Sequence, residues 1–290
     1  MIAFVFPGQG SQKKGMGAGL FDEVREYTAV EREVDAILGY SMRKLCLEDP
    51  ENKLKETQFT QPSLYVVNAL HYYKAAAEGT RPVYLAGHSL GEYNALLAAG
   101  AFDFLTGLRL VQKRGELMSQ AKNGGMGAVI GLNAAAISKV IADNGLSSID
   151  VANFNTPSQT VVSGPVDDIK RAGPFFEKGG AQMYIPLQVS AAFHSRYMAD
   201  AARAFADFLA PMSFNAPRIP VIANVTAQPY PAENASESVK SMLVKQITSS
   251  VRWTDSVRFL IGQGVTQFSE MGPGNVLTRM VQQIQQSKDS

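Results

Sequence analysis

Residues 83–92 read Val-Tyr-Leu-Ala-Gly-His-Ser-Leu-Gly-Glu. The first four are apolar and predict a buried β-strand, and a short helix is expected from 92 to 99. The five residues between them fit the pattern G-x-S-x-G, which forms a tight strand-to-helix turn with an exposed serine. The alternative is a glycine-rich connection with an ordinary serine. The strand and helix around the turn favour an α/β fold in which Ser89 is a nucleophile.

The rest of the chain predicts a body of mixed strands and helices that is interrupted once. Apolar runs predict further strands at 2–6, 221–223 and 265–268, and helices are expected at 20–39, 64–77, 103–122, 196–209, 239–248, 253–261 and 276–285. Residues 127–187 instead follow the order β-α-β-β-α-β, which is that of a ferredoxin-like unit. We therefore expect a large subdomain of residues 1–125 and 191–290, a small inserted subdomain of residues 126–190, and a ligand cleft between them.

Composition and charge exclude several classes of protein. The formal net charge of +1 argues against non-specific binding of nucleic acid. Cys46 is the single cysteine, so neither an internal disulfide nor a cysteine-based zinc cluster can form, and its apolar surroundings predict a buried thiol. The sequence has neither a signal peptide nor an apolar run long enough to span a membrane. We expect a soluble, cytoplasmic protein without a metal ion or a membrane partner.

A nucleophilic serine needs a base, and the chain offers three histidines. His88 is the sequence neighbour of Ser89, so its side chain should diverge from the hydroxyl and pack beneath the turn. His71 lies in the middle of a predicted helix and is interpreted as a structural residue. His194, where the insert returns to the body, is the remaining candidate for the general base.

No acidic residue has a recognisable place as the third member of a triad. Asp150, Asp167 and Asp168 lie between Ser89 and His194, but within the predicted insert. A backbone carbonyl could orient the imidazole instead, which would make the site a Ser–His dyad.

One arginine is out of place on the helix predicted from residue 103. At about 100° per residue, Arg114 falls among apolar residues such as Leu110 and Met118. Burying an unpaired guanidinium is costly, so Arg114 needs an anion. On this pattern alone, an ion pair with a carboxylate of the protein or a snorkelling side chain explains Arg114 as well as a carboxylate of the substrate does.

Several ordered motifs together resemble the malonyl-CoA:acyl-carrier-protein transacylases and the acyltransferase domains of polyketide synthases. The resemblance extends from about residue 2 to about residue 285. The motifs are Phe6-Pro7-Gly8-Gln9-Gly10-Ser11-Gln12, Gly87-His88-Ser89-Leu90-Gly91-Glu92, Arg114-Gly115, Phe193-His194-Ser195, Asn224-Val225-Thr226, Val251-Arg252-Trp253 and Gly272-Pro273-Gly274-Asn275-Val276-Leu277.

This resemblance implies a fold and a set of site residues. The fold would be an α/β-hydrolase-like body with a parallel sheet core and an inserted ferredoxin-like subdomain. Ser89 would be the nucleophile and His194 the base. The backbone N–H groups of Gln9 and Leu90 would form the oxyanion hole, and the backbone carbonyl of Gln246 would orient the histidine.

The resemblance also implies the substrate and the partner. Arg114 would bind the free carboxylate of malonyl-CoA, and the malonyl group would pass through an ester on Ser89 to the phosphopantetheine thiol of an acyl carrier protein. No bound cofactor is expected, because coenzyme A enters as part of the substrate. Phe193, in Ala191-Ala192-Phe193-His194, would crowd an α-methyl group and favour malonyl units, although Ala191 departs from the histidine that is usual there.

Three functional alternatives remain at this point. The chain is expected to be a stand-alone enzyme or an excised domain that serves either polyketide or fatty-acid synthesis, and Phe193 beside His194 slightly favours the polyketide case. A hydrolase that clears stalled acyl groups from carrier proteins is a rival, which Arg114 argues against. A catalytically silent docking domain is another, which the presence of Ser89, His194 and Arg114 argues against.

Overall fold

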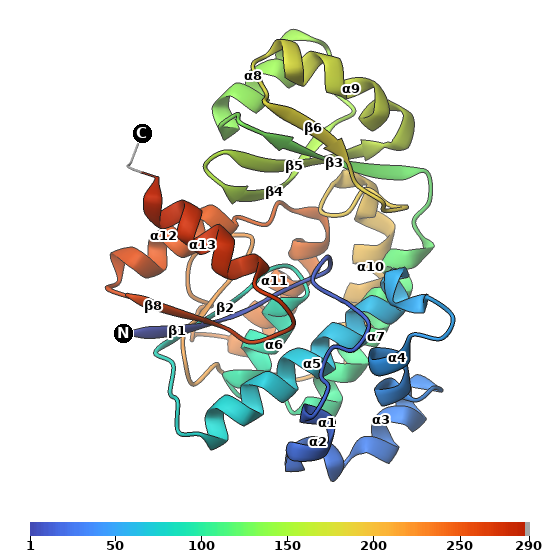
Figure 1. Cartoon of the computed structure of the whole chain (residues 1–290), viewed down its shortest axis with the longest axis vertical. Coiled ribbons are helices and arrows are strands. Elements are labelled where there is room, and N and C mark those ends of the chain that lie inside the picture. Colours follow the sequence, from blue (N-terminus) through green and yellow to red (C-terminus); the bar gives the residue numbers. More distant parts are fainter. Residues whose placement is uncertain (288–290) are drawn as a thin grey trace.

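The computed structural model describes residues 1–287, which form a larger body and a smaller insert placed above it (Figure 1). The body contains β1 (Ile2–Phe6), α1 (Leu20–Glu23), α2 (Arg25–Thr28), α3 (Glu31–Leu38), α4 (Met42–Glu48), a 3₁₀ turn (Lys53–Lys55), α5 (Thr57–Ala77), β2 (Tyr84–Gly87), α6 (Gly91–Ala98), α7 (Phe104–Gln120), a second 3₁₀ turn (Arg196–Met198), α10 (Ala199–Leu209), β7 (Val221–Ile222), α11 (Ala235–Thr248), α12 (Trp253–Gly262), β8 (Gln267–Glu270) and α13 (Val276–Gln286). The insert contains β3 (Gly124–Ile130), α8 (Ala134–Asp143), β4 (Asp150–Thr156), β5 (Gln159–Pro165), α9 (Val166–Lys178) and β6 (Met183–Pro186).

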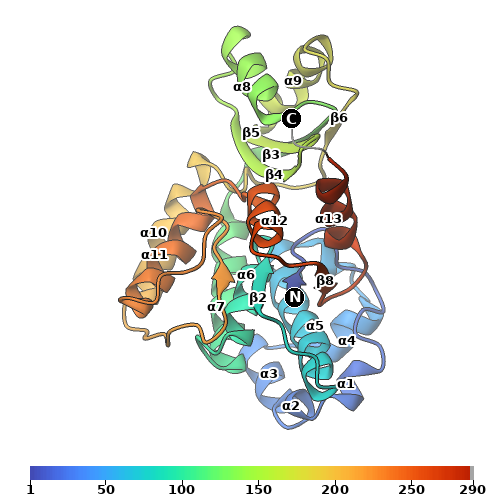
Figure 2. The same cartoon turned by 90° about the vertical axis from the view of Figure 1, so that its left-hand side faces the viewer.

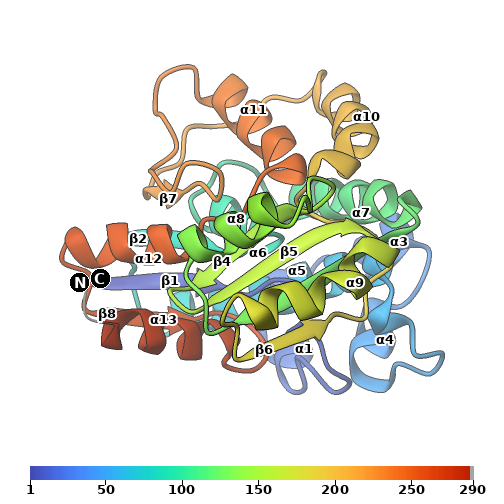
Figure 3. The ribbon, with the colours of Figure 1, turned by 90° about the horizontal axis from the view of Figure 1, so that it is seen from above.

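The body is built on a four-stranded parallel sheet in the order β7-β2-β1-β8. Strand β1 is buried on both faces, which explains its unbroken apolar sequence. Ala3 and Val5 face α12 and α13, whereas Phe4 and Phe6 belong to the larger core formed with α5, α6 and α7. Helix α10 packs against α11 and α7, outside these layers (Figure 3).

The insert is an antiparallel sheet in the order β4-β5-β3-β6, with α8 and α9 on its outer side (Figure 2). Neighbouring residues of its strands alternate between two cores. Val129 and Val162 pack beneath α8 and α9, whereas Met126 and Val161 join the core of the body. The insert therefore buries one face of its sheet against the body.

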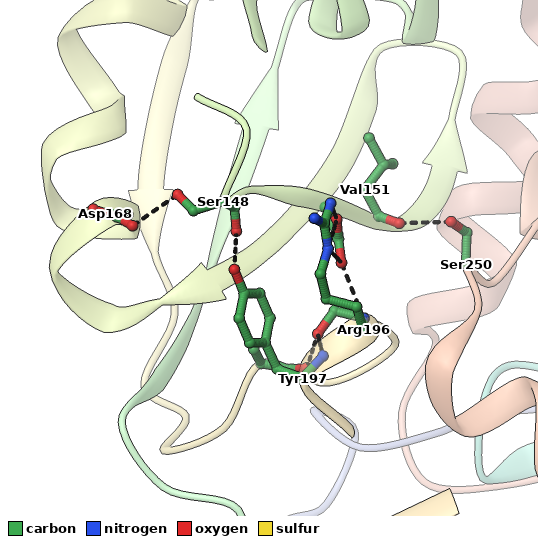
Figure 4. A network of polar contacts seen from close by, with 9 residues as sticks. Ser148, Val151, Asp168, Arg196, Tyr197 and Ser250 are labelled. Atoms are coloured by element: carbon green, nitrogen blue, oxygen red, sulfur yellow. Dashed lines mark hydrogen bonds and ion pairs between the residues drawn. The ribbon is translucent and has the colours of Figure 1, made fainter. Parts of the chain in front are cut away.

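Strand β4 is attached to two separate body segments (Figure 4). On one side, the carboxylate of Asp150 accepts hydrogen bonds from the backbone N–H of Arg196, at 3.0 Å, and from its guanidinium. On the other side, the Ser250 hydroxyl donates to the carbonyl of Val151 at 2.6 Å, and Val251 exchanges two 2.9 Å backbone hydrogen bonds with β4. These two body segments begin a few residues after His194 and Gln246 in the sequence.

Tertiary packing overrides the sequence pattern in two predicted helices. The helix expected at 20–39 is divided into α1, α2 and α3, because Val24 has an extended backbone and Val30, which caps the start of α3, has a non-helical one. The helix expected at 64–77 begins earlier, at Thr57, and contains Pro62 in its interior. Its residues from Thr60 to Leu70 are almost completely buried, and this burial offsets the hydrogen bond that proline removes.

Smaller differences from the predictions concern the ends of elements. Helix α4 was not predicted, and Cys46 lies buried within it as expected of an apolar thiol. Strand β8 begins two residues after the predicted strand, and β3 begins at Gly124, before the expected start of the insert at 126. Among the described residues, no helix combines the length and apolar character that crossing a membrane requires.

The attachment of β4 predicts the effect of Asp150→Asn on stability. The variant should lower the free energy of unfolding by about 0.5–1.5 kcal/mol, because a partly buried charged acceptor becomes a neutral amide. Urea unfolding measures this change. Asp143→Asn is the matched control, since Asp143 pairs with Lys139 on the exposed surface of α8, and its loss should cost less than about 0.5 kcal/mol. Equal effects of the two variants would contradict the prediction.

Candidate active site

Ser89 lies in a sharp turn between the end of β2 and the start of α6. Its φ of 50° is in the left-handed region, which is uncommon for a residue with a side chain and costs free energy. The two glycines of the motif are required by close packing. A Cβ on Gly87 would lie 1.9 Å from the carbonyl carbon of Gly91, and a Cβ on Gly91 would lie 2.0 Å from the carbonyl oxygen of Phe6. The turn therefore presents the Ser89 hydroxyl in one fixed direction.

The side chain of Asn224 holds this turn from the side. Its Oδ1 accepts a 2.7 Å hydrogen bond from the backbone N–H of Ser89, and its Nδ2 donates a 2.6 Å hydrogen bond to the carbonyl of Gly87. The Asn224 motif was noticed in the sequence, but nothing there indicated this role.

His194 is the histidine that contacts Ser89. The Ser89 Oγ lies 2.7 Å from His194 Nε2, and His194 Nδ1 lies 2.8 Å from the backbone carbonyl oxygen of Gln246. A carbonyl only accepts hydrogen bonds, so the proton of the neutral ring is on Nδ1 and the lone pair of Nε2 faces the hydroxyl. His194 has a φ of 56°, so both members of this pair have a left-handed backbone.

The environment of His194 keeps its ring neutral. The residue is 4% exposed. Burial first, and then the charge of Arg114, lower the pKa of His194 from its usual 6.5 to about 3. An unprotonated imidazole beside a serine hydroxyl can accept the proton when the oxygen attacks an electrophile.

The other candidates for a base or an acid lie elsewhere. His88 Nε2 pairs with Asn155 Oδ1 at 2.9 Å beneath the turn, and His71 is half-buried on α5. Asp150 is bonded to Arg196, and Asp168 to Ser148 and Arg171. In the described part of the chain, the orienting partner of His194 Nδ1 is therefore a carbonyl rather than a carboxylate.

Arg114 is buried against the same hydroxyl. It is 1% exposed, and its Nη2 donates hydrogen bonds to Ser89 Oγ at 3.1 Å and to Gln246 Oε1 at 2.8 Å. Its Nη1 donates to Gln61 Oε1 at 2.8 Å, and its guanidinium lies over the ring of Tyr93. Among residues 1–287, no carboxylate of the protein forms an ion pair with Arg114, so the first of the two anions that the sequence allowed is not its direct partner.

A cavity of about 220 Å³ opens over these groups, and both subdomains line it. Its lining includes Gln9, Leu90 and Phe193, together with Ser89, His194 and Arg114. Within residues 1–287, the backbone N–H groups of Gln9 and Leu90 donate to no other protein atom, so both are available to an oxyanion. Phe193, directly before His194 in the sequence, is 6% exposed and lines the cavity.

A buried carboxylate beside the site had not been recognised from the sequence. Glu92 follows the nucleophile turn on α6, is 0% exposed, and accepts hydrogen bonds from Tyr230, Gln246 and the backbone N–H of Asn224. Its presence in a helix whose other residues are mostly apolar was the signal that it is buried.

Comparisons with known proteins show which proteins this chain is similar to. The model of the acyl transferase domain matches residues 3–290. The chain is 52% identical to a polyketide biosynthesis malonyl CoA-acyl carrier protein transacylase of Bacillus velezensis, over 100% of the chain and 99% of that protein. A malonyl CoA-acyl carrier protein transacylase of Burkholderia pseudomallei has a crystal structure with a TM-score of 0.93 at 48% identity, covering 100% of this chain and 99% of that one.

A further solved structure contains a carrier protein. It is a malonyl-transacylase in complex with its type II PKS acyl-carrier protein, with a TM-score of 0.91 at 37% identity, covering 98% of this chain and 92% of that one.

The surroundings of His194 predict its titration. Nitrogen-15 spectra of labelled imidazoles should show His194 neutral and protonated on Nδ1 from pH 8 down to pH 5, because its pKa is lowered to about 3. His88→Gln and His71→Gln identify the three signals. A signal of His194 that titrates near pH 6.5 would contradict the prediction.

Proposed function

Because the chain belongs to the family of acyl transferase domains, we propose that it transfers a malonyl group from malonyl-CoA to the phosphopantetheine thiol of an acyl carrier protein. The observation that carries this proposal is the position of one hydroxyl. Ser89 Oγ lies 2.7 Å from His194 Nε2 and 3.1 Å from Arg114 Nη2. A base and a cation at the same nucleophile suit an acyl group that carries a second, free carboxylate. The relative from Bacillus velezensis has the name of this activity.

In the first half-reaction, Ser89 attacks the thioester carbonyl of malonyl-CoA. The bond between Oγ and the carbonyl carbon forms while the hydroxyl proton moves to His194 Nε2. The N–H groups of Gln9 and Leu90 stabilise the negative charge on the carbonyl oxygen of the tetrahedral intermediate. The carbon–sulfur bond then breaks, and His194 returns its proton to the leaving coenzyme A thiolate.

In the second half-reaction, the phosphopantetheine thiol of the carrier protein replaces coenzyme A. His194 takes the thiol proton, sulfur attacks the malonyl ester, and the bond to Oγ breaks as the proton passes to Ser89. The sequence of the two steps is a ping-pong mechanism. Both steps exchange one acyl bond for another, and His194 carries every proton, so the reaction needs no cofactor bound to this chain.

Arg114 and Phe193 supply the selectivity in this proposal. The guanidinium of Arg114 binds the free malonyl carboxylate through charge-assisted hydrogen bonds, which an acetyl group lacks. The ring of Phe193 restricts space beside the carbon between the two carbonyl groups, so that a methyl branch is excluded. The small volume of the cavity, about 220 Å³, also limits the water that would otherwise hydrolyse the ester.

The finer classification of the fold is part of this proposal. The parallel sheet with a nucleophile at a strand-to-helix turn supports an α/β-hydrolase-like body of residues 1–125 and 191–290. The antiparallel order β4-β5-β3-β6 with two helices on one face supports a ferredoxin-like insert of residues 126–190. The name of the Bacillus velezensis relative supports a role in supplying malonyl units for polyketide synthesis.

Intact-mass measurement against a panel of acyl-CoA thioesters tests the activity. Malonyl-CoA should add one malonyl group to the protein, acetyl-CoA and methylmalonyl-CoA should react far more slowly, and a holo acyl carrier protein should remove the malonyl group. Ser89→Ala should acquire no acyl group from any donor, because the nucleophile is absent. Faster release of free acid from acetyl-carrier protein than loading of malonyl groups would show that the protein is a hydrolase instead.

Replacement of Arg114 tests the selectivity. Arg114→Ala should reduce kcat/KM for malonyl-CoA by about 10- to 100-fold, and that for acetyl-CoA by less than about threefold, because a charge-assisted pair is lost with one substrate only. Lys113→Ala is the matched control, since it removes a positive charge from the exposed side of the same helix. Equal losses with both substrates would assign Arg114 a structural role.

A further inference from the structure

The side chain of Gln246 lies between two buried groups of opposite charge. Its Oε1 accepts the hydrogen bond from Arg114 Nη2, and its Nε2 donates one to Glu92 Oε2 and one of 2.9 Å to the carbonyl of Ser89. The amide can face only this way, because a donor faces its oxygen and acceptors surround its nitrogen. Glu92 and Arg114 are therefore connected through one amide, without touching.

Gln246 also connects this chain of contacts to the base. Its backbone carbonyl accepts the hydrogen bond of His194 Nδ1. The residue is 0% exposed, and no other residue in the described chain binds both Arg114 and His194 apart from the nucleophile Ser89. Gln246 therefore contacts the imidazole through its backbone, which belongs to α11, and the cation through its side chain, which Glu92 holds.

The arrangement solves a conflict between stability and binding. A guanidinium removed from water needs negative charge nearby. A carboxylate in direct contact with Arg114 would supply that charge, but it would occupy the N–H groups that a substrate carboxylate has to reach. The amide of Gln246 lies between the two groups, so the negative charge of Glu92 stays near Arg114 while only one hydrogen bond of the guanidinium is used.

We propose that Glu92 is a positioning residue that acts through Gln246, holding Arg114 charged, oriented and free to select acyl groups with a free carboxylate. The proposal deepens the function given above and rests on it. Glu92 itself contacts neither Ser89 Oγ nor the cavity, so its effect reaches the substrate only through the amide.

The surroundings of Glu92 support this role. Burial raises the pKa of its carboxyl to about 7, while the hydrogen bonds of Tyr230, Gln246 and Asn224 and the charge of Arg114 oppose the rise. The charged form therefore depends on this set of partners. The ionisable groups that face it are Arg114 from α7, Tyr93 from α6 and Tyr230 from the segment before α11. Burial raises the pKa of both tyrosines, so they stay neutral, and the guanidinium of an arginine stays protonated in proteins.

Glu92→Gln changes one oxygen to an amide nitrogen without changing the volume. The N–H₂ group that it introduces faces the N–H₂ group of Gln246. Turning the introduced amide would instead place its N–H₂ group against the backbone N–H of Asn224, and turning Gln246 would place its nitrogen against Arg114. Every orientation leaves a buried mismatch, which disturbs the position of Arg114.

Acylation by malonyl-CoA and acetyl-CoA is measured at pH 8 for the wild type, Glu92→Gln and Tyr65→Phe. Glu92→Gln should reduce kcat/KM for malonyl-CoA at least about tenfold, and that for acetyl-CoA less than about threefold. Tyr65→Phe is the control, because it removes a buried hydrogen bond to the carbonyl of Phe104 between α5 and α7 without reaching Gln246. It should lower the melting temperature and leave the malonyl-to-acetyl ratio unchanged.

The wild type provides a second test that needs no substitution. Its malonyl-to-acetyl ratio of kcat/KM should fall as the pH is lowered from 8.5 to 6, because Glu92 becomes protonated near pH 7 and the coenzyme A part is common to both substrates. The expected fall is at least about threefold.

The outcomes separate the inference from the proposed function. A wild type that forms no malonyl ester overturns the function itself. If the wild type prefers malonyl-CoA, the proposed function stands and only the role of Glu92 is at stake. That role is overturned if Glu92→Gln leaves the malonyl-to-acetyl ratio unchanged, if Tyr65→Phe changes the ratio equally, or if the wild-type ratio is constant between pH 6 and pH 8.5.

Discussion

The structure depends on a positive charge that is withdrawn from water and yet touches no carboxylate within residues 1–287. Arg114 sits among amide and hydroxyl oxygens and over the ring of Tyr93, and these are weaker partners than an ion pair. Such a set of contacts costs folding free energy, and in the proposed function the free carboxylate of the malonyl group supplies the missing anion. The large apolar core around α5 and α7 supplies the stability that offsets this arrangement.

The parts of the site that depend on local sequence were predictable. The turn at Ser89 follows from two glycines at a strand-to-helix junction, and the structure leaves no room for a Cβ where they stand. His194 followed from elimination, because the chain has three histidines and two of them lie in unsuitable places. The apolar surroundings of Arg114 followed from helical periodicity, which is reliable in a long amphipathic helix such as α7.

The parts that depend on long-range packing were not predictable in this way. Nothing near Gln246 in the sequence indicates that its side chain meets Arg114, 132 residues away, or that Glu92 lies on its other side. The division of residues 20–39 into three short helices and the early start of α5 also depend on neighbours that are distant in sequence. In each case, tertiary contacts outweigh the local pattern.

The attachment of strand β4 has a consequence for recombination between relatives. The side chain of Asp150 at the start of the strand holds the residues after His194, and the backbone of the strand holds the residues after Gln246. An insert exchanged only between its two connections to the body would place a β4 from another protein against the segments that follow His194 and Gln246. Chimeras that are designed to change acyl-group selectivity therefore need the insert, Arg196 and residues 250–254 from the same parent protein.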